Sequence, residues 1–257
     1  MSIYTTEITS DKLVSDNPLH HRLLSAYLFA VKYIYGNVLE LGCGEGRGID
    51  IILKKSKSFT AIDKISELTD KLSKKYPDHT FISSSFPPFK NINDNSFDTL
   101  ISFQVIEHIK NDKLFIEEIY RILKPGGKAL ISTPNIKMTL TRNPWHVREY
   151  TSEELKELVS RNFDKIIIKG ISGNDRVKKY YKENKNSVMK FKRLDILNLE
   201  KYLPNFLYRI PYEFLNRINR NKLEYNDSSL VSSISTNDYI LEDDNPKNLD
   251  LFFILEK

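Results

Sequence analysis

Cysteine is almost absent from this chain of 257 residues, which contains only Cys43. A single cysteine excludes an internal disulfide and any zinc site built from several thiolates, and it favours a reducing compartment. No apolar run approaches the roughly 20 residues of a membrane-spanning helix, and the first residues have neither the basic start nor the apolar stretch of a signal peptide. We therefore expect a soluble, cytoplasmic protein.

Glycine is also scarce, yet four of the nine glycines lie between Gly42 and Gly48. This cluster directly follows a short apolar segment and is accompanied by two acids, Glu40 and Glu45. Glycines between a strand and the beginning of a helix let a ligand approach the backbone closely, and they leave amide N–H groups pointing at it. The segment therefore predicts a ligand-binding loop.

Apolar segments of strand and helix character alternate along the chain, which predicts an α/β fold with a doubly wound, mostly parallel, seven-stranded sheet. A helix over 18–35, with Asp16 or Asn17 as its N-cap, precedes the first strand, and Thr151 is expected to cap the helix at 152–161. The expected strands are 37–41, 59–62, 80–82, 97–103, 128–133, 165–171 and 249–255, and the other expected helices are 47–56, one ending near 77, and 111–123 followed by a sharp turn at 124–127.

Charge and composition divide the chain into four parts. Residues 1–36 form an N-terminal segment and helix covering the site, 37–171 the core, 172–238 an inserted helical lobe broken at Pro204 and Pro211, and 239–257 a terminal strand that completes the sheet. Between Arg176 and Lys222 there are thirteen Lys/Arg and four Asp/Glu, a net +9 within a chain of +5. This basic segment is rich in tyrosine and phenylalanine.

The glycine loop is typical of two ligand classes, and its charges distinguish them. A dinucleotide pyrophosphate usually binds Gly-x-Gly-x-x-Gly, but Arg47 stands where the third glycine would be. Glu40 and Glu45 would repel a pyrophosphate and attract a ligand that carries an ammonium and a sulfonium. Asp63, twenty-one residues after Gly42 and at the end of the second strand, is suited to the hydroxyls of a ribose in either ligand class.

Four features together resemble the class I S-adenosylmethionine-dependent methyltransferases, in particular the ubiquinone-pathway O-methyltransferase-like, type 11 group. They are the segment Val38–Gly46, Asp63, the strand 96–104 running into Val105-Ile-Glu-His-Ile109, and Leu123-Lys-Pro-Gly-Gly127. The resemblance covers residues 37–171 and implies a Rossmann-like methyltransferase fold, with S-adenosylmethionine as cofactor and S-adenosylhomocysteine as product.

By this resemblance, the methionine part of the cofactor lies on the glycine loop, the ribose at Asp63 and the adenine beside the loop 83–86. The family often has an acid in that last loop, where this chain has serines, and Phe86 and Phe89 are interpreted either as adenine contacts or as core residues. The expected cofactor-binding residues are Glu40, Gly42, Gly44, Gly46, Asp63, Ser84, Ser85, Phe86, Phe103 and Gln104.

The catalytic candidates are Glu107, His108 and His146, which follow the fourth and fifth strands. A histidine side chain ordinarily has a pKa near neutrality, so it can act as the general base. The alternative is a structural histidine that bonds a backbone carbonyl. The metal-dependent 2′-O-methyltransferases of small RNAs carry Glu-x-x-Glu-His and a later histidine as magnesium ligands. Here Gln104 replaces the first carboxylate, which weakens a magnesium site, so we expect no metal ligand and keep magnesium as the alternative.

The loop after the fifth strand supplies the expected substrate residues, Asn135, Arg142, Trp145 and Tyr150. Loops at the carboxyl ends of strands contact substrates in such sheets, although Trp145 and Tyr150 can equally anchor the loop. We interpret the basic lobe as a lid over a small-molecule acceptor that is acidic or lipid-linked. Contact of segment 176–222 with a membrane surface, nucleic acid or a second subunit remains open, as does the oligomeric state.

The resulting prediction is methyl transfer to an oxygen, with nitrogen as the second choice, of a small acceptor. The alternatives are an RNA 2′-O-methyltransferase, a nicotinamide oxidoreductase and a non-catalytic cofactor-binding protein.

Overall fold

The computed structural model describes residues 13–195 and 199–257, which form two compact units. The core unit comprises Ala26–Met138, Arg148–Ile171 and Leu241–Lys257. The lobe unit comprises, within the described residues, 13–25, Thr139–Val147 and Ser172–Ile240. The loop that carries Arg142 and Trp145 therefore belongs to the lobe unit, although it directly follows a core segment along the chain.

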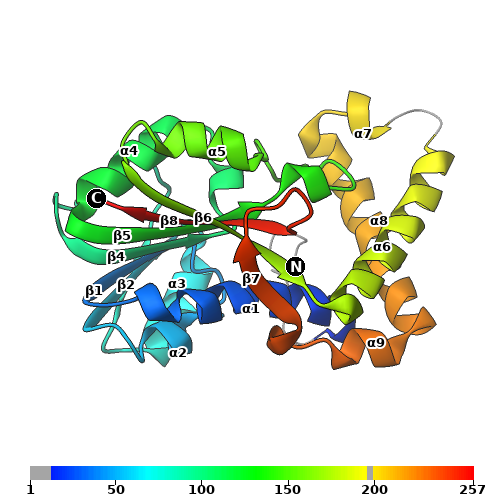
Figure 1. Cartoon of the computed structure of the whole chain (residues 1–257), viewed down its shortest axis with the longest axis horizontal. Coiled ribbons are helices and arrows are strands. Elements are labelled where there is room, and N and C mark those ends of the chain that lie inside the picture. Colours follow the sequence, from blue (N-terminus) through cyan, green and yellow to red (C-terminus); the bar gives the residue numbers. More distant parts are fainter. Residues whose placement is uncertain (1–12, 196–198) are drawn as a thin grey trace. The chain divides into compact units, whose positions relative to one another are not determined.

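One sheet organises the fold, with the strand order β3-β2-β1-β4-β5-β8-β6-β7 (Figure 1). Parallel pairing joins the first five strands, and β8 pairs antiparallel with both β5 and β6. This arrangement confirms the doubly wound, mostly parallel sheet. The strands are β1 Asn37–Leu41, β2 Ser58–Asp63, β3 Thr80–Ser83, β4 Phe97–Phe103, β5 Leu123–Pro134, β6 Lys165–Gly173, β7 Tyr239–Asp243 and β8 Asp250–Glu256. The described residues contain eight strands instead of the predicted seven because 239–243 forms an edge strand of its own.

Helices cover both faces of the sheet in the core unit. Figure 1 shows α4 (Asp112–Ile122) and α5 (Ser152–Val159) on one face, and α2 (Ile49–Ile52) and α3 (Ser66–Lys75) on the other. Apolar side chains at helical spacing on α4 and α5, including Phe115 and Leu155, pack into one buried cluster with the strands. Thr151 caps α5 in a reciprocal capping box with Glu154, as the sequence predicts.

The lobe unit is helical, as its apolar spacing predicts. It contains α6 (Asp175–Leu194), α7 (Leu199–Tyr202), α8 (Asn205–Asn226) and α9 (Ser228–Ser233), together with the first part of α1 (Asn17–Ala30). Asn219 on α8 donates a 2.7 Å hydrogen bond to Asn184 on α6, so the two long helices lie side by side. Within the described residues, none of the helices combines the length and the hydrophobicity of a membrane span.

A predicted turn and a predicted helix interruption are wrong. The segment 124–127 is not a turn, because β5 begins at Leu123 and the left-handed Gly126 (φ +77°) makes a local irregularity within the strand. The helix α8 continues through Pro211, since a proline removes a single amide donor and the bonds on either side persist. Pro204, in contrast, does separate α7 from α8.

The beginnings of two helices also differ from the prediction. The helix after the glycine loop starts at Ile49 instead of Arg47, because residues 44–48 form turns around the left-handed Gly46 (φ +80°). Asn17 is not the N-cap of α1, and the Asp16 side chain makes no capping hydrogen bond within the described residues. A 3-10 turn, Val14–Asp16, leads into the helix, and Asn17 is itself helical. The Asp16 carboxylate instead accepts hydrogen bonds from Arg217 and Arg220 on α8, which ties α8 to this end of the chain.

Candidate functional site

The glycine loop connects β1 to α2 in a conformation that requires glycine. Gly42, Gly44 and Gly46 have φ values of +72°, +52° and +80°, in the left-handed region that side chains disfavour. A Cβ at Gly42 would lie 2.5 Å from Val105 Cγ2, whereas a Cβ at Gly44 would meet no atom within 4 Å. The backbone at Gly44 therefore faces open space, where a ligand can approach it.

Glu40 lies at the carboxyl end of β1, beneath this loop, and its side chain is only 1% exposed. Its Oε1 accepts a 2.7 Å hydrogen bond from the hydroxyl of Tyr27, while its buried Oε2 has no partner. Burial is the main cause of a pKa raised to about 7; the bond from Tyr27 acts to lower this pKa, and the charge of Asp63 acts to raise it. Within the described residues, this carboxyl group forms no ion pair with a cation.

Tyr27 is a site residue that the sequence analysis missed. Its ring packs edge-on against Phe103 at 4.9 Å, and a Cβ at Gly48 would lie 2.0 Å from it. The tyrosine ring occupies the space where a side chain at position 48 would lie, so only glycine is accommodated there. Only the helical pattern of the segment was visible in the sequence, and nothing in that pattern links Tyr27 to Glu40.

Asp63 is the last residue of β2 and holds the loop in place. Its Oδ2 accepts a 2.8 Å hydrogen bond from the amide of Gly44, and its Oδ1 accepts a 3.0 Å bond from the amide of Ile65. Each carboxylate oxygen can accept a further bond, so these contacts leave capacity for two ligand hydroxyls. The fold thus brings together Glu40, Gly44 and Asp63, as the sequence predicts.

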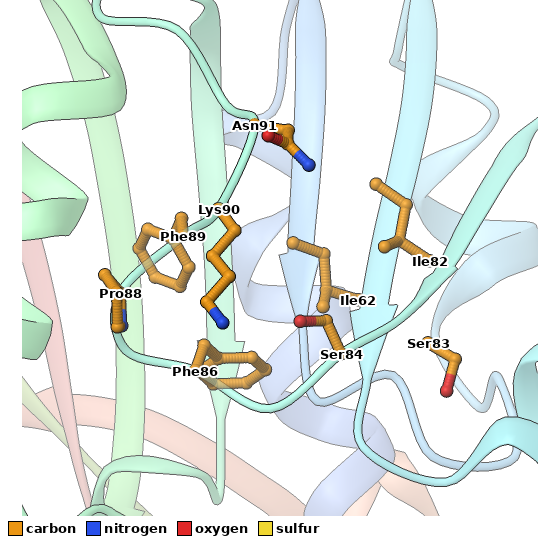
Figure 2. A pocket seen from close by; sticks show the side chains of 9 residues that line it. All are labelled: Ile62, Ile82, Ser83, Ser84, Phe86, Pro88, Phe89, Lys90 and Asn91. Carbon is orange, nitrogen blue, oxygen red and sulfur yellow. The ribbon is translucent and has the colours of Figure 1, made fainter.

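A pocket of about 210 Å³ lies at the carboxyl ends of β2 and β3, where Ile62 and Ser83 line it (Figure 2). The amide of Ser84, a lining residue, donates a 2.9 Å bond to the carbonyl of Asp63, so this side of the pocket is held against the end of β2. No acid lines the pocket, in agreement with the serines in the sequence. Its lining residues are Ile62, Ile82, Ser83, Ser84, Phe86, Pro88, Phe89, Lys90 and Asn91.

The two phenylalanines of this pocket pack against the core, and their contact with an adenine stays a prediction. Phe86 stacks on Phe115 of α4, with ring centroids 5.9 Å apart, and Phe89 is buried in the same apolar cluster. Both rings also line the pocket. Ser85 is exposed and is not a lining residue, so its cofactor contact stays a prediction.

The carboxyl end of β4 provides Phe103 and Gln104. Phe103 lies between Tyr27 and Phe252. Gln104 has an unusual left-handed φ of +58°, and its side-chain amide donates 3.4 Å bonds to Ser132 and Asp250. Strained backbone of this kind is concentrated at functional sites. Contact of these two residues with the cofactor remains a prediction.

The predicted catalytic residues lie in different units. Glu107 is buried in the core unit, where its carboxylate accepts a 2.8 Å bond from the Thr133 hydroxyl. The half-buried His108 follows it in the same 3-10 turn. His146 belongs to the lobe unit, and its Nε2 lies 2.8 Å from the side-chain nitrogen of Asn143. The hypothesis that the two histidines face one pocket stays a prediction.

Two of the predicted substrate residues have structural contacts in the core unit. The Asn135 side chain is buried and donates a 2.9 Å bond to the carbonyl of Asn248. Tyr150 is fully buried, its hydroxyl donates a 2.9 Å bond to Asp112, and burial raises its pKa. The anchoring interpretation therefore describes Tyr150, and contact of either residue with a substrate is untested.

The other two predicted substrate residues meet α8 in the lobe unit. The Arg142 guanidinium lies over the ring of Tyr208 at 4.9 Å, and the Arg209 guanidinium lies over the ring of Trp145 at 3.7 Å. Neither guanidinium forms an ion pair within the described residues, and the Nε of each is buried without a hydrogen bond. The Arg142 guanidinium donates a 2.7 Å bond to the carbonyl of Leu203, and the Arg142 backbone amide donates a 2.7 Å bond to the Glu200 carboxylate. We call Arg142, Trp145, Tyr208 and Arg209 the arginine–aromatic cluster; sequence analysis missed Tyr208 and Arg209, which are separated from the loop in sequence.

The two loop glycines should respond differently to alanine. We expect Gly42→Ala to lower the free energy of unfolding by about 3 kcal/mol, because a left-handed φ and a clash with Val105 add together. Gly44→Ala should cost about 1 kcal/mol, because only the φ penalty applies. Urea unfolding of both variants measures the difference, and equal losses would contradict this geometry.

Comparison with known proteins shows which proteins the core unit resembles. Residues 39–131 match the family model of a methyltransferase domain. A probable S-adenosylmethionine-dependent methyltransferase of Mycolicibacterium smegmatis is 35% identical over 129 residues, which are 48% of this chain and 49% of that protein. The mitochondrial ubiquinone biosynthesis O-methyltransferase of Dictyostelium discoideum is 32% identical over 137 residues, covering 48% of this chain and 39% of the relative.

The chain thus spans about half the length, or less, of the curated relatives it matches. Among solved structures, an S-adenosylmethionine-dependent methyltransferase from Thermotoga maritima superimposes with a TM-score of 0.57 at 16% identity, over 93% of this chain and 91% of the other. At that identity the likeness shows the fold alone. Residues 39–131 are therefore similar to a methyltransferase domain, and the sheet has the Rossmann-like fold of such domains.

Proposed function

We propose that this chain is an S-adenosylmethionine-dependent methyltransferase that methylates an oxygen of a small, acidic acceptor. The observation that carries the proposal is the buried Glu40 carboxylate with one unpartnered oxygen, beside a glycine loop whose open face begins at Gly44. A ligand ammonium supplies the missing cation. A pyrophosphate would add negative charge near Glu40 and Asp63, which disfavours the nicotinamide alternative.

The residues of the core unit fit the parts of this cofactor. Glu40 and the glycine loop would hold the methionine part, Asp63 the ribose hydroxyls, and the pocket lined by Ser84 and Phe86 the adenine. The adenine would be held mainly by apolar contact, because no acid lines that pocket. When bound, the cofactor supplies an electrophilic methyl group on its sulfonium.

The protein then has to orient the acceptor and remove its proton. We assign the general base to His108, with the buried Glu107 beside it in the same turn and His146 as a second candidate. Gln104 lacks the negative charge of a hard metal ligand, and its side-chain amide contacts Ser132 and Asp250. This chemistry supports a metal-free base over a magnesium centre.

An acidic acceptor is supported by the arginine–aromatic cluster. Part-buried guanidinium groups without a carboxylate favour an incoming anion, since burial weakens the competition from water. The loop with Arg142 and Trp145 also continues the chain from the carboxyl end of β5, where acceptors approach sheets of this type. Oxygen as the target atom is supported by the similarity to an O-methyltransferase of ubiquinone biosynthesis.

A first test concerns the base. We expect His108→Ala and His146→Ala each to abolish the transfer of a labelled methyl group from S-adenosylmethionine to a panel of hydroxylated aromatic acids, because both remove a proton-accepting group. Affinity for S-adenosylhomocysteine should change by less than about twofold, since neither histidine belongs to the glycine loop.

The matched control is His79→Ala, in which the histidine precedes β3 and so lies at the amino edge of the sheet. It should retain full turnover. Full turnover in both the His108 and His146 variants would contradict the catalytic assignment.

A second test concerns the negative charge of the proposed acceptor. Arg142→Gln and Arg209→Gln should each raise KM for an acidic acceptor by about tenfold, the loss of one charge-assisted hydrogen bond, and leave KM for its neutral methyl ester unchanged. Arg161→Gln, which alters an exposed arginine on the surface of the core unit, is the control. Equal KM values of the wild-type protein for the acid and its ester would overturn the assignment.

A further inference from the structure

Helix α8 exposes an unusual row of large apolar side chains. Phe206, Ile210 and Phe214 are 68%, 75% and 66% exposed, and Ile218 continues the same spacing of four residues. Residues four apart lie on one face of a helix, so this row extends for about 18 Å along α8. Leu207, next to Phe206 in the sequence, is exposed as well. We call this row the α8 apolar face.

The packing of the lobe does not account for this face. The buried residues of α8 are Tyr208, Asn219 and Leu223, which lie on a different side of the helix. That side holds the contact with α6, through the bond from Asn219 to Asn184. An exposed apolar row of this length on a helix already packed on another side marks an interaction surface.

The positive charge of the lobe that carries this face restricts the kind of partner that can bind it. Segment 176–222 has a net charge of +9, and Lys182, Lys185 and Lys190 on the neighbouring α6 are exposed and make no ion pair within the described residues. A second copy would bring two strongly basic lobes together, which their repulsion opposes. A helix that exposes bulky apolar residues on a strongly basic lobe is instead suited to the interface of a membrane rich in anionic lipid.

We propose that the α8 apolar face docks the protein on an anionic lipid surface. The helix lies parallel to the surface, with Phe206, Ile210 and Phe214 inserted among the acyl chains near the headgroups, and the net positive charge of the lobe attracts it to the anionic surface. The attachment is peripheral and reversible. It is independent of the proposed methyl transfer, so either proposal can fail while the other stands.

Vesicle sedimentation of the full chain tests the proposal. We expect binding to phosphatidylcholine vesicles that contain about one-third phosphatidylglycerol, weak binding to phosphatidylcholine alone, and release when NaCl rises from about 0.1 to 0.5 M. The double variant Phe206→Ser/Phe214→Ser should bind at least about tenfold more weakly, because it loses two inserted aromatic rings.

The control is Ile167→Ser, which removes a half-exposed isoleucine from β6 in the core unit and should leave vesicle binding unchanged. Thermal unfolding and S-adenosylhomocysteine affinity verify that each variant is folded. A second variant, Lys182→Gln/Lys185→Gln/Lys190→Gln, should weaken binding to the anionic vesicles alone. Absent vesicle binding, equal binding by the Phe206→Ser/Phe214→Ser variant, or its conversion of a wild-type dimer to a monomer in light scattering would overturn the proposal.

Discussion

A carboxylate without a cation, that of Glu40, is the constraint around which the core unit is organised. Burial raises its pKa to about 7, so the folded protein binds this proton more tightly than the unfolded chain does. The stabilising contribution of the protonated group is present at low pH and is lost as pH rises through about 7. At higher pH the ionised form costs the folded state up to about 3 kcal/mol. A ligand ammonium at Oε2 would offset this cost, which links cofactor binding to the stability of the site.

The neighbouring residues preserve this arrangement. Tyr27 satisfies one oxygen of Glu40, and its ring requires glycine at position 48. Asp63 fixes the amide of Gly44, so the backbone next to the open space cannot turn away. The sheet supplies the positions, since Glu40, Asp63 and Phe103 all lie at the carboxyl ends of neighbouring parallel strands. The proposed cofactor site thus belongs to the core unit, whereas the exposed apolar and basic surfaces and the arginine–aromatic cluster belong to the lobe unit.

Features that depend on local chemistry could be predicted from the sequence. Glycines at 42, 44 and 46 and the acid at 63 follow from backbone geometry and strand order, and Thr151 is followed three residues later by the Glu154 that its capping box needs. Features that depend on distant partners could not. The pairing of Tyr27 with Glu40, the arginines that hold Asp16, and the meeting of Arg209 with Trp145 each join segments that no spacing rule connects. The continuation of α8 through Pro211 was not predictable from the proline itself, because one missing amide donor does not have to end a helix.

Calorimetric titration with S-adenosylhomocysteine, with NAD as the comparison ligand, tests the central claim that a buried carboxylate selects a cationic cofactor. We predict that S-adenosylhomocysteine alone binds, and that its affinity weakens as pH falls below about 7, by up to tenfold per pH unit, because Glu40 must lose its proton. Glu40→Gln should bind weakly at every pH, whereas Glu45→Gln should keep the pH dependence of the wild type. Binding of NAD, or an affinity for S-adenosylhomocysteine that does not change between pH 8 and pH 6, would contradict the account.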